Sequence, residues 1–257
     1  MRILRKRTAS KPASNRLKNV PERELSVPPG GGARDTPYAD FDIASSDKWR
    51  HDWDDKTRAL VLDRVHHVPP YRFFSAHEVE VLEALCAQVI PQEDRPPQER
   101  VPIAPWIDER LFKGEGEGYR YEDMPPDAEV YRLGLAGTDQ AAHAMFGSSF
   151  PSLSDARQQE VIRRVADGSA PGDAWRRLPS ARFVHKLVND VISNYYAHPA
   201  AWAEIGFSGP ASPRGHIRLG LGKRDPWEAE EERPVSSVDI VRRNLGKGSQ
   251  ESGEATH

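Results

Sequence analysis

With 257 residues, 37% hydrophobic side chains and a mean hydropathy of −0.70, the chain is too polar to be packed throughout, so we expect one domain with long tails. The formal net charge of −3 provides no strong field and argues against nucleic acid as a partner. The single cysteine, Cys86, lies among apolar residues, which excludes a disulfide framework or a cysteine-based metal site within one chain and predicts a small buried side chain.

The first 45 residues are expected to form a disordered tail. Residues 1–20 carry seven basic side chains and no acidic one, and a stretch rich in proline and glycine follows them. This composition, without sustained apolar periodicity, is typical of disordered segments. The basic start resembles that of a signal peptide, but no apolar core follows it, and no apolar run is long enough to span a membrane. As written, the sequence predicts a cytoplasmic location, with a periplasmic or membrane-associated location through a partner as the alternative.

Residues 46–222 are expected to form one helical domain. The first predicted helix spans roughly Asp54 to His66 and ends before a pair of prolines. The second helix is predicted most clearly, because Ser75 and Glu78 have the spacing of a capping box and a proline at position 91 stops the helix. Its apolar positions form one stripe, which comprises Val79, Leu82, Leu85, Cys86 and Val89.

A Pro-rich connection leads to two further predicted helices. The short one begins near Pro105, which suits a first helical turn. The long one spans about Asp127 to Phe146. Gly134 and Gly137 lower its helix propensity, so we expect another stretch of backbone to pack closely against it there.

The last two predicted helices precede a charged tail. Ser154 is expected to cap the first of them and Gly168 to close it. The second runs from about Ser180 to Tyr196 and has a wide apolar face, formed by Phe183, Val184, Leu187, Val188, Val191 and Tyr195. No segment alternates as a strand does. The expected fold is therefore all-α, an irregular bundle of about five to seven helices, with residues 223–257 as a flexible tail.

The nine histidines of the chain are potential metal ligands. A di-iron bundle needs Glu-x-x-His pairs on facing helices, and the sequence contains none. Asp63 with His66, and Asp139 with His143, have a related spacing but lack supporting carboxylates. We expect no metal site. A stand-alone metal-dependent helical enzyme stays open as the alternative, and it would use Asp63, His66, His67 or His198.

Sequence signatures of other active sites are also absent. The chain has no Gly-x-Ser-x-Gly nucleophile elbow, no Walker-type loop, no Gly-x-Gly-x-x-Gly after a strand and no Cys-x-x-Cys-His haem motif. We therefore expect neither catalytic nor cofactor-binding residues in this chain.

The segment from Tyr195 to His216 combines aromatic residues, glycines, prolines and an arginine. Tyrosine, tryptophan and arginine are the usual anchors of protein interfaces. The candidate partner interface is formed by Tyr195, Tyr196, His198, Trp202, Phe207 and Arg214. The alternative is that this segment folds back on its own bundle.

Several motifs, in this order and spacing, resemble the gluconate 2-dehydrogenase subunit 3 family over roughly residues 50–220. The first is Tyr71-Arg72-Phe73-Phe74-Ser75, which leads into a helix that ends with Val89-Ile90-Pro91. The others are Ile107-Asp108-x-x-Leu111, Leu153-Ser154 with Gln158-Gln159-x-x-Ile162, and Tyr195-Tyr196-x-His198-Pro199 with Trp202-x-x-Ile205-Gly206.

This resemblance implies a small non-catalytic subunit of a membrane-associated sugar or alcohol dehydrogenase complex. In that family the large partner binds FAD, a cytochrome c subunit often receives the electrons, and the small subunit supports maturation, stability and often export of the large one. The resemblance implies no catalytic residues in this chain. The sequence departs from the family pattern because it lacks a twin-arginine signal. A general helical interaction module without a redox partner is the remaining alternative.

Overall fold

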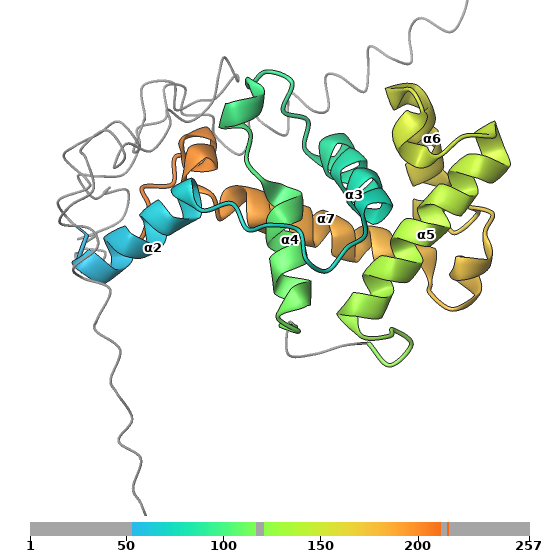
Figure 1. Ribbon diagram of the computed structural model, residues 1–257, viewed down its shortest axis with the longest axis horizontal. Coiled ribbons are helices and arrows are strands. Elements are labelled where there is room, and N and C mark those ends of the chain that lie inside the picture. The colour runs from blue at the N-terminus through green and yellow to red at the C-terminus, as the bar shows by residue number, and fades with distance from the viewer. Residues whose placement is uncertain (1–52, 117–120, 212–214, 216–257) are drawn as a thin grey trace, which may run out of the picture.

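The computed structural model describes residues 53–116, 121–211 and 215, and the regular elements in these ranges are all helices (Figure 1). In chain order they are α2 (Asp55–His66), α3 (Ala76–Val89), η4 (Pro97–Glu99), α4 (Ile103–Phe112), α5 (Asp127–Phe146), η5 (Phe150–Ser152), α6 (Asp155–Ala166), η6 (Asp173–Arg176), α7 (Ser180–Tyr196) and η7 (Pro199–Ile205), where η marks a short 3-10 helix. The predicted all-α fold is confirmed. Both predicted tails lie outside the described residues.

Helix α7 is the element around which the bundle is built. It packs against α3, α4, α5 and α6, and it runs lengthwise behind α3, α4 and α5 in Figure 1. Its inward side chains are at most 2% exposed, and they are Phe183, Leu187, Val191 and Tyr195. Cys86 of α3 joins the same core, as predicted, and burial raises the pKa of its thiol. The wide apolar face predicted for this helix thus lies largely in the core.

The start of α3 follows the predicted capping pattern. Ser75 accepts a hydrogen bond from the backbone N–H of Glu78, and the Glu78 carboxylate accepts one from the N–H of Ser75. The start of α6 differs from the prediction. Ser154 is at its N-cap position, but its hydroxyl makes no capping hydrogen bond. Asp155 in the first turn provides the negative charge that favours a helix N-terminus.

The two glycines of α5 face aromatic rings rather than the backbone of another element. A Cβ atom added to Gly137 would lie 2.5 Å from the indole of Trp175, and one added to Gly134 would overlap the ring of Phe183. The prediction of close packing at these positions is correct, but its partner was predicted wrongly. A ring packed against the helix at these positions needs the space left by the absent Cβ, as a second backbone would.

A buried carboxylate holds the extended segment between α2 and α3 in place. Asp108 of α4 is fully buried and accepts backbone N–H hydrogen bonds from Arg72, Phe73 and Phe74, with donor–acceptor distances of 2.8 to 3.2 Å. Its charge is therefore compensated by three aligned backbone dipoles. Two motifs that lie over thirty residues apart in the sequence meet at this contact.

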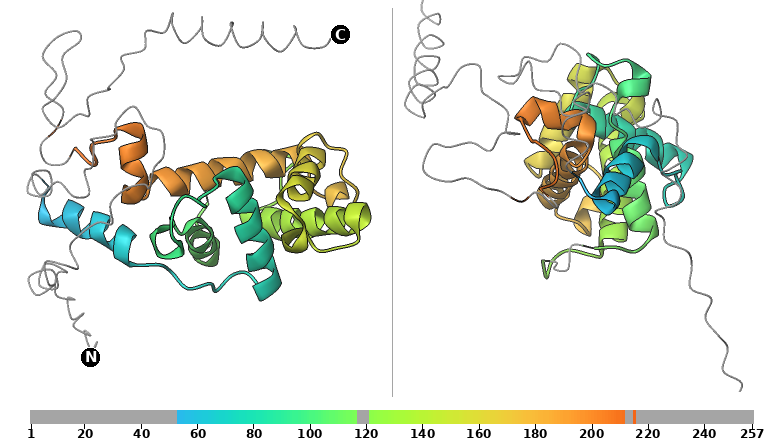
Figure 2. Two further views of the ribbon diagram at one scale, coloured as in Figure 1. Left: turned by 90° about the horizontal axis from the view of Figure 1, so that it is seen from above. Right: turned by 90° about the vertical axis from the view of Figure 1, so that its left-hand side faces the viewer.

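Helix α2 lies beside η7 at one end of the molecule, away from the main core (Figure 2). A small separate cluster joins them, formed by Trp53, Val61 and Trp202. The indole N–H of Trp53 donates to the carbonyl oxygen of Pro210 at 3.0 Å. The predicted first helix is thus confirmed, and its packing partner is the segment after α7.

Candidate partner-binding surface

Helix α7 has a second apolar face that its own bundle covers only in part. Val184, Val188, Ile192 and Tyr196 follow each other at intervals of four residues, so they form one stripe along the helix. Ile192 is 41% exposed, and the other three are partly exposed. The stripe continues the predicted apolar face of α7 beyond the part that is buried in the core.

The exposed α7 side chains that flank this stripe carry no carboxylate, ammonium or guanidinium group. His185, Asn189 and Ser193 follow the stripe residues along α7, and all three are exposed. In a chain of which 29% of the residues are charged, this is an unusual stretch of surface. Depletion of charge is typical of the central part of a protein–protein interface.

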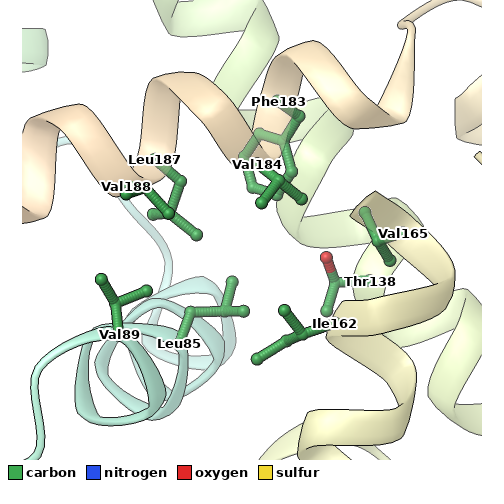
Figure 3. A pocket seen from close by; sticks show the side chains of 9 residues that line it. All are labelled: Leu85, Val89, Thr138, Ile162, Val165, Phe183, Val184, Leu187 and Val188. Atoms are coloured by element: carbon green, nitrogen blue, oxygen red, sulfur yellow. The ribbon is translucent and has the colours of Figure 1, made fainter. Parts of the chain in front are cut away.

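A pocket opens at the N-terminal half of the stripe, between α3, α6 and α7 (Figure 3). Its walls include Leu85 and Val89 of α3, Ile162 and Val165 of α6, and Val184 and Val188 of α7. The space that it encloses measures about 30 Å³. Val89 was predicted to be buried, but it is only partly covered because it lies at this pocket.

The pocket offers no free polar group. The only side-chain oxygen or nitrogen in its lining belongs to Thr138 of α5, whose hydroxyl donates to the carbonyl oxygen of Gly134 at 2.8 Å. Phe183 and Leu187 of α7 complete the lining. The side chains drawn in Figure 3 surround a space that is lined by carbon atoms apart from the Thr138 hydroxyl.

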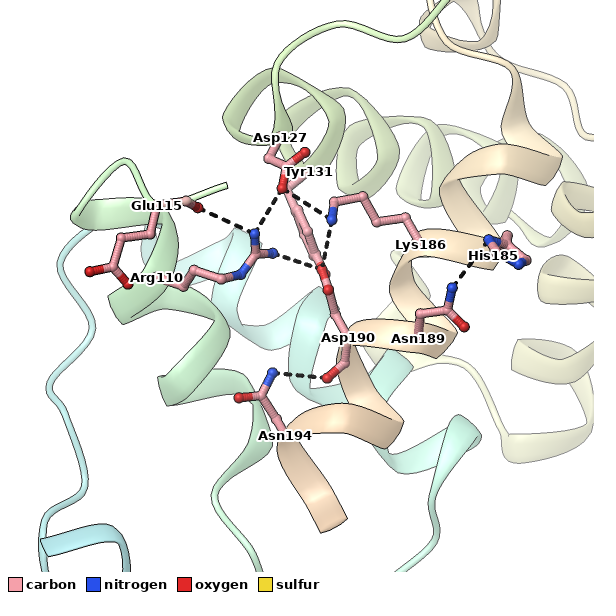
Figure 4. A network of polar contacts seen from close by, with 9 residues as sticks. All are labelled: Arg110, Glu115, Asp127, Tyr131, His185, Lys186, Asn189, Asp190 and Asn194. Carbon is pink, nitrogen blue, oxygen red and sulfur yellow. Dashed lines mark hydrogen bonds and ion pairs between the residues drawn. The ribbon is translucent and has the colours of Figure 1, made fainter. Parts of the chain in front are cut away.

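A network of ion pairs on the opposite side of α7 fixes the orientation of the helix (Figure 4). Arg110 of α4 lies between Asp127 of α5 and Asp190 of α7, with N–O distances of 2.7 Å to each. Lys186 lies 3.0 Å from Asp127 and 3.4 Å from Asp190. The buried hydroxyl of Tyr131 donates to Asp190 at 2.6 Å. Two carboxylates and two cations thus balance each other across three helices.

The protonation states in this network are stabilised by its own members. Burial alone would raise the pKa of Asp127, but hydrogen bonds from Arg110 and Lys186 outweigh it and lower that pKa. Burial, together with the charge of Asp190, raises the pKa of Tyr131 well above its usual value. The network therefore holds α7 in place, because each of its charges faces an opposite charge within the chain.

The structure places three of the predicted interface residues in the interior. Tyr195 is fully buried, and His198 and Trp202 are each 5% exposed. Tyr195 donates to Glu204, and the Trp202 indole donates to the carbonyl oxygen of Tyr196 at 3.0 Å. The positions of these three residues agree with the alternative interpretation, in which the segment folds back on its own bundle.

Two of the remaining predicted interface residues keep accessible surface. Tyr196 is partly exposed and belongs to the α7 stripe, while Phe207 is 44% exposed and packs edge-on against Trp202. Arg214 lies outside the described residues. The predicted interface stays a prediction, and Tyr196 and Phe207 are its accessible members.

His198 is held neutral by its surroundings. Its Nδ1 accepts a hydrogen bond from the backbone N–H of Ala200. Burial, aided by the positive charges of Arg64 and Arg95, lowers its pKa to about 4. The histidine therefore contributes a cap to η7 and remains uncharged at neutral pH.

Sequence reasoning missed the role of Arg95. This arginine is buried, pairs with Glu204 and donates to the carbonyl oxygen of Ala200 at 3.2 Å. It ties the Pro-rich connection between α3 and α4 to η7. A lone arginine among prolines and acidic residues gives no local signal of such a contact, because its partner lies about 100 residues away.

The candidate metal ligands make other contacts in the structure. Asp139 accepts a hydrogen bond from the backbone N–H of Phe150 at 2.8 Å, and its second oxygen lies 3.0 Å from His77 and 3.7 Å from His143. Within the described ranges, no group of three or more His, Cys, Asp or Glu side chains is placed to hold a metal ion. None of the helices described is both long enough and apolar enough to cross a membrane.

Comparison with known proteins gives one match. Residues 76–209, more than half of the chain, match the family described as gluconate 2-dehydrogenase subunit 3. The match begins at α3 and ends just after η7, so it contains the α7 stripe and the pocket, while α2 lies before it. No curated protein and no solved structure matches the chain.

Proposed function

The chain belongs to the gluconate 2-dehydrogenase subunit 3 family, and from this premise we propose that it is a non-catalytic small subunit that binds and stabilises the large subunit of an FAD-dependent sugar or alcohol dehydrogenase of the GMC type. FAD is bound by that large subunit and not by this chain. A cytochrome c subunit is the expected electron acceptor of the complex.

The observation that carries the proposal is the uncharged apolar stripe on α7. An isolated helical domain buries such a stripe against its own core, whereas a subunit leaves part of it for its partner. The stripe lies within the region that matches the family. Its partly exposed valine, isoleucine and tyrosine side chains are the kind that lose contact with water when two subunits associate.

The buried polar groups give further support to a non-catalytic role. The carboxylate of Asp108 accepts hydrogen bonds from backbone N–H groups. That of Asp190 forms ion pairs with Arg110 and Lys186 and accepts a hydrogen bond from Tyr131. Each of these carboxylates stabilises the fold through partners within the chain. A general acid or base instead needs access to a substrate and a pKa suited to proton transfer.

Co-expression tests the proposal. The full chain, carrying an affinity tag, is produced together with the large subunit of a GMC-type dehydrogenase from the same genome, and that large subunit is expected to co-purify with bound FAD and to be more soluble than when produced alone. The purified tagged chain by itself should show no flavin absorbance and no dehydrogenase activity. Flavin or turnover in the isolated chain, or failure of the two proteins to co-purify, would refute the proposal.

A pair of substitutions makes the test specific to the stripe. Ile192→Asp places a charge on the stripe, and we expect it to reduce recovery of the large subunit at least roughly tenfold, because burying an unpaired carboxylate in an interface is strongly unfavourable. Leu60→Asp makes the same kind of replacement at an exposed aliphatic side chain of α2, which lies before the region that matches the family. We expect this control to recover the large subunit as the unmodified chain does.

A further inference from the structure

Helix α2 is attached to the rest of the bundle by a small set of contacts. Of its 12 residues, Val61 and Leu62 are the buried ones, and the cluster that joins it to Trp202 is separate from the main core. The helix lies at one end of the molecule (Figure 2) and precedes the region that matches the family. A helix that buries so little apolar surface can separate locally while the main core stays folded.

The polar contacts of α2 leave two buried N–H groups without an acceptor. The guanidinium of Arg64 lies 4.0 Å from the ring centroid of Trp106 in α4 and donates to Oδ1 of Asn194 in α7 at 3.2 Å. Neither Nε of Arg64 nor Nε1 of Trp106 has a hydrogen-bond partner among the described residues, although both atoms are buried. Such groups regain hydrogen bonds to water when the helix separates, so they weaken its attachment.

The surface on which α2 rests depends on one histidine. His198 is the N-cap of η7, and its Nδ1 accepts a hydrogen bond from the backbone N–H of Ala200 at 3.2 Å. The same short helix carries Trp202, whose ring packs edge-on against that of Trp53 with centroids 6.3 Å apart. A proton on Nδ1 would place two N–H donors opposite each other and abolish the cap. The position of Trp202 under α2 therefore depends on a neutral His198.

The charges around His198 oppose its protonation. The positive charges that act on its ring are those of Arg64, in α2, and Arg95, in the connection between α3 and α4. The acid of η7, Glu204, forms an ion pair with Arg95 and accepts a hydrogen bond from Tyr195 of α7. An imidazolium would add a third positive charge to the two guanidinium groups, and separation of α2 would take one of them away. Protonation of His198 and attachment of α2 therefore oppose each other.

We propose that α2 is a strap that acid releases: it covers η7 and the adjoining end of α7 while His198 is neutral, and it separates from the bundle when His198 takes up a proton. This device goes beyond the proposed function and does not rest on it. Release uncovers Trp202 and Asn194, which α2 and the residue before it contact in the attached state. The chain thus offers a larger accessible surface in acid than at neutral pH.

Amide hydrogen exchange of the isolated full chain tests the proposal. Protection factors, which correct for the intrinsic pH dependence of exchange, are compared between about pH 7 and about pH 4.5 for residues 58–67 and for α3 and α5. The pKa of His198 is about 4 in the folded chain and near 6.5 for an exposed histidine. We therefore expect the protection factors of α2 to fall at least roughly tenfold at the lower pH. Those of α3 and α5 should stay within about threefold, because the lowered pKa of Asp127 keeps its ion pairs charged.

Two variants assign the release to His198. In His198→Asn the amide oxygen can accept the same backbone N–H but takes up no proton, so α2 should keep its protection at the lower pH. The matched control His66→Asn removes an exposed histidine of α2 itself, and its α2 should be released as in the unmodified chain. A measurement that needs no variant is the NMR titration of the His198 ring, which should gain its proton over the pH range in which α2 loses protection.

Four results would overturn the proposal. They are protection of α2 that does not change with pH, an equal fall in His198→Asn, a parallel fall in α3, and a His198 ring that stays neutral while α2 separates. Because the chain is measured alone, none of these results depends on whether it binds a dehydrogenase subunit, and failure of that binding leaves the release of α2 unaffected.

Discussion

Replacing Asp108 with alanine should detach the segment that joins α2 to α3. The carboxylate accepts hydrogen bonds from three consecutive backbone N–H groups, those of Arg72, Phe73 and Phe74. Without it, the N–H of Phe74 is left buried and unpaired, while those of Arg72 and Phe73, which are less buried, can regain water. A buried unpaired N–H group costs about 1–3 kcal/mol. Adding the weaker losses at the other two positions, we expect the free energy of unfolding to fall by about 2–4 kcal/mol.

Urea denaturation followed by far-ultraviolet circular dichroism measures this loss, and the melting temperature should fall by roughly 5–15 °C for a domain of this size. Amide hydrogen exchange should show faster exchange at residues 72–74. The control is Asp173→Ala, which removes an exposed carboxylate that forms an ion pair with the exposed Arg176. It should change the unfolding free energy by less than about 0.5 kcal/mol. A loss below about 1 kcal/mol for Asp108→Ala, or one equal to that of the control, would refute the assignment of Asp108 as the clip for this segment.

Two further predictions concern α5 and His198. Gly134→Ala should destabilise the fold by about 1–3 kcal/mol in chemical denaturation, because the added methyl group meets the ring of Phe183, although alanine favours a helix. The double variant Gly134→Ala/Phe183→Leu should lose less than the sum of the single losses, and strict additivity would contradict the contact. For His198, the folded-state pKa of about 4 lies below the unfolded value near 6.5. Folding therefore favours the neutral ring. The contribution of His198 to the free energy of unfolding is fully present above pH 6.5 and is lost as the pH falls from 6.5 towards 4. We expect this to reduce the unfolding free energy by up to about 3 kcal/mol, and His198→Gln, measured over the same pH range, should show a shallower decline. An equal decline in both proteins would rule out His198 as its source.

Most helix boundaries could be predicted because their signals are local. The capping box at Ser75 and Glu78 acts within one helical turn, and so do the prolines that flank the helices. These signals can therefore be recognised in the sequence without knowledge of the fold. The predicted ranges of α5 and α7 agree with the structure. Ser154 shows the limit of such signals, because its position was predicted correctly and its hydrogen bond was not.

The partly exposed surface of α7 could be predicted only in part. The sequence shows an apolar face wider than one packing partner needs, but it cannot say which edge of that face the bundle covers. In the structure the core takes Phe183, Leu187 and Val191, and the edge with Val188 and Ile192 is left accessible. The aromatic segment after α7 was the more obvious candidate interface, yet Tyr195 and Trp202 are buried by contacts within the chain.

By itself, then, the sequence determined the helical class of the fold, the ends of its main helices and its resemblance to one family, because caps, helix breakers and apolar periodicity act between near neighbours. The tertiary structure alone decided that Asp108 holds the segment before α3, that Arg95 joins η7, and that a pocket opens beside Val188. Each of these depends on residues that lie far apart in the chain, and their contacts exist only once the helices have packed. No pattern within a single helix contains that information.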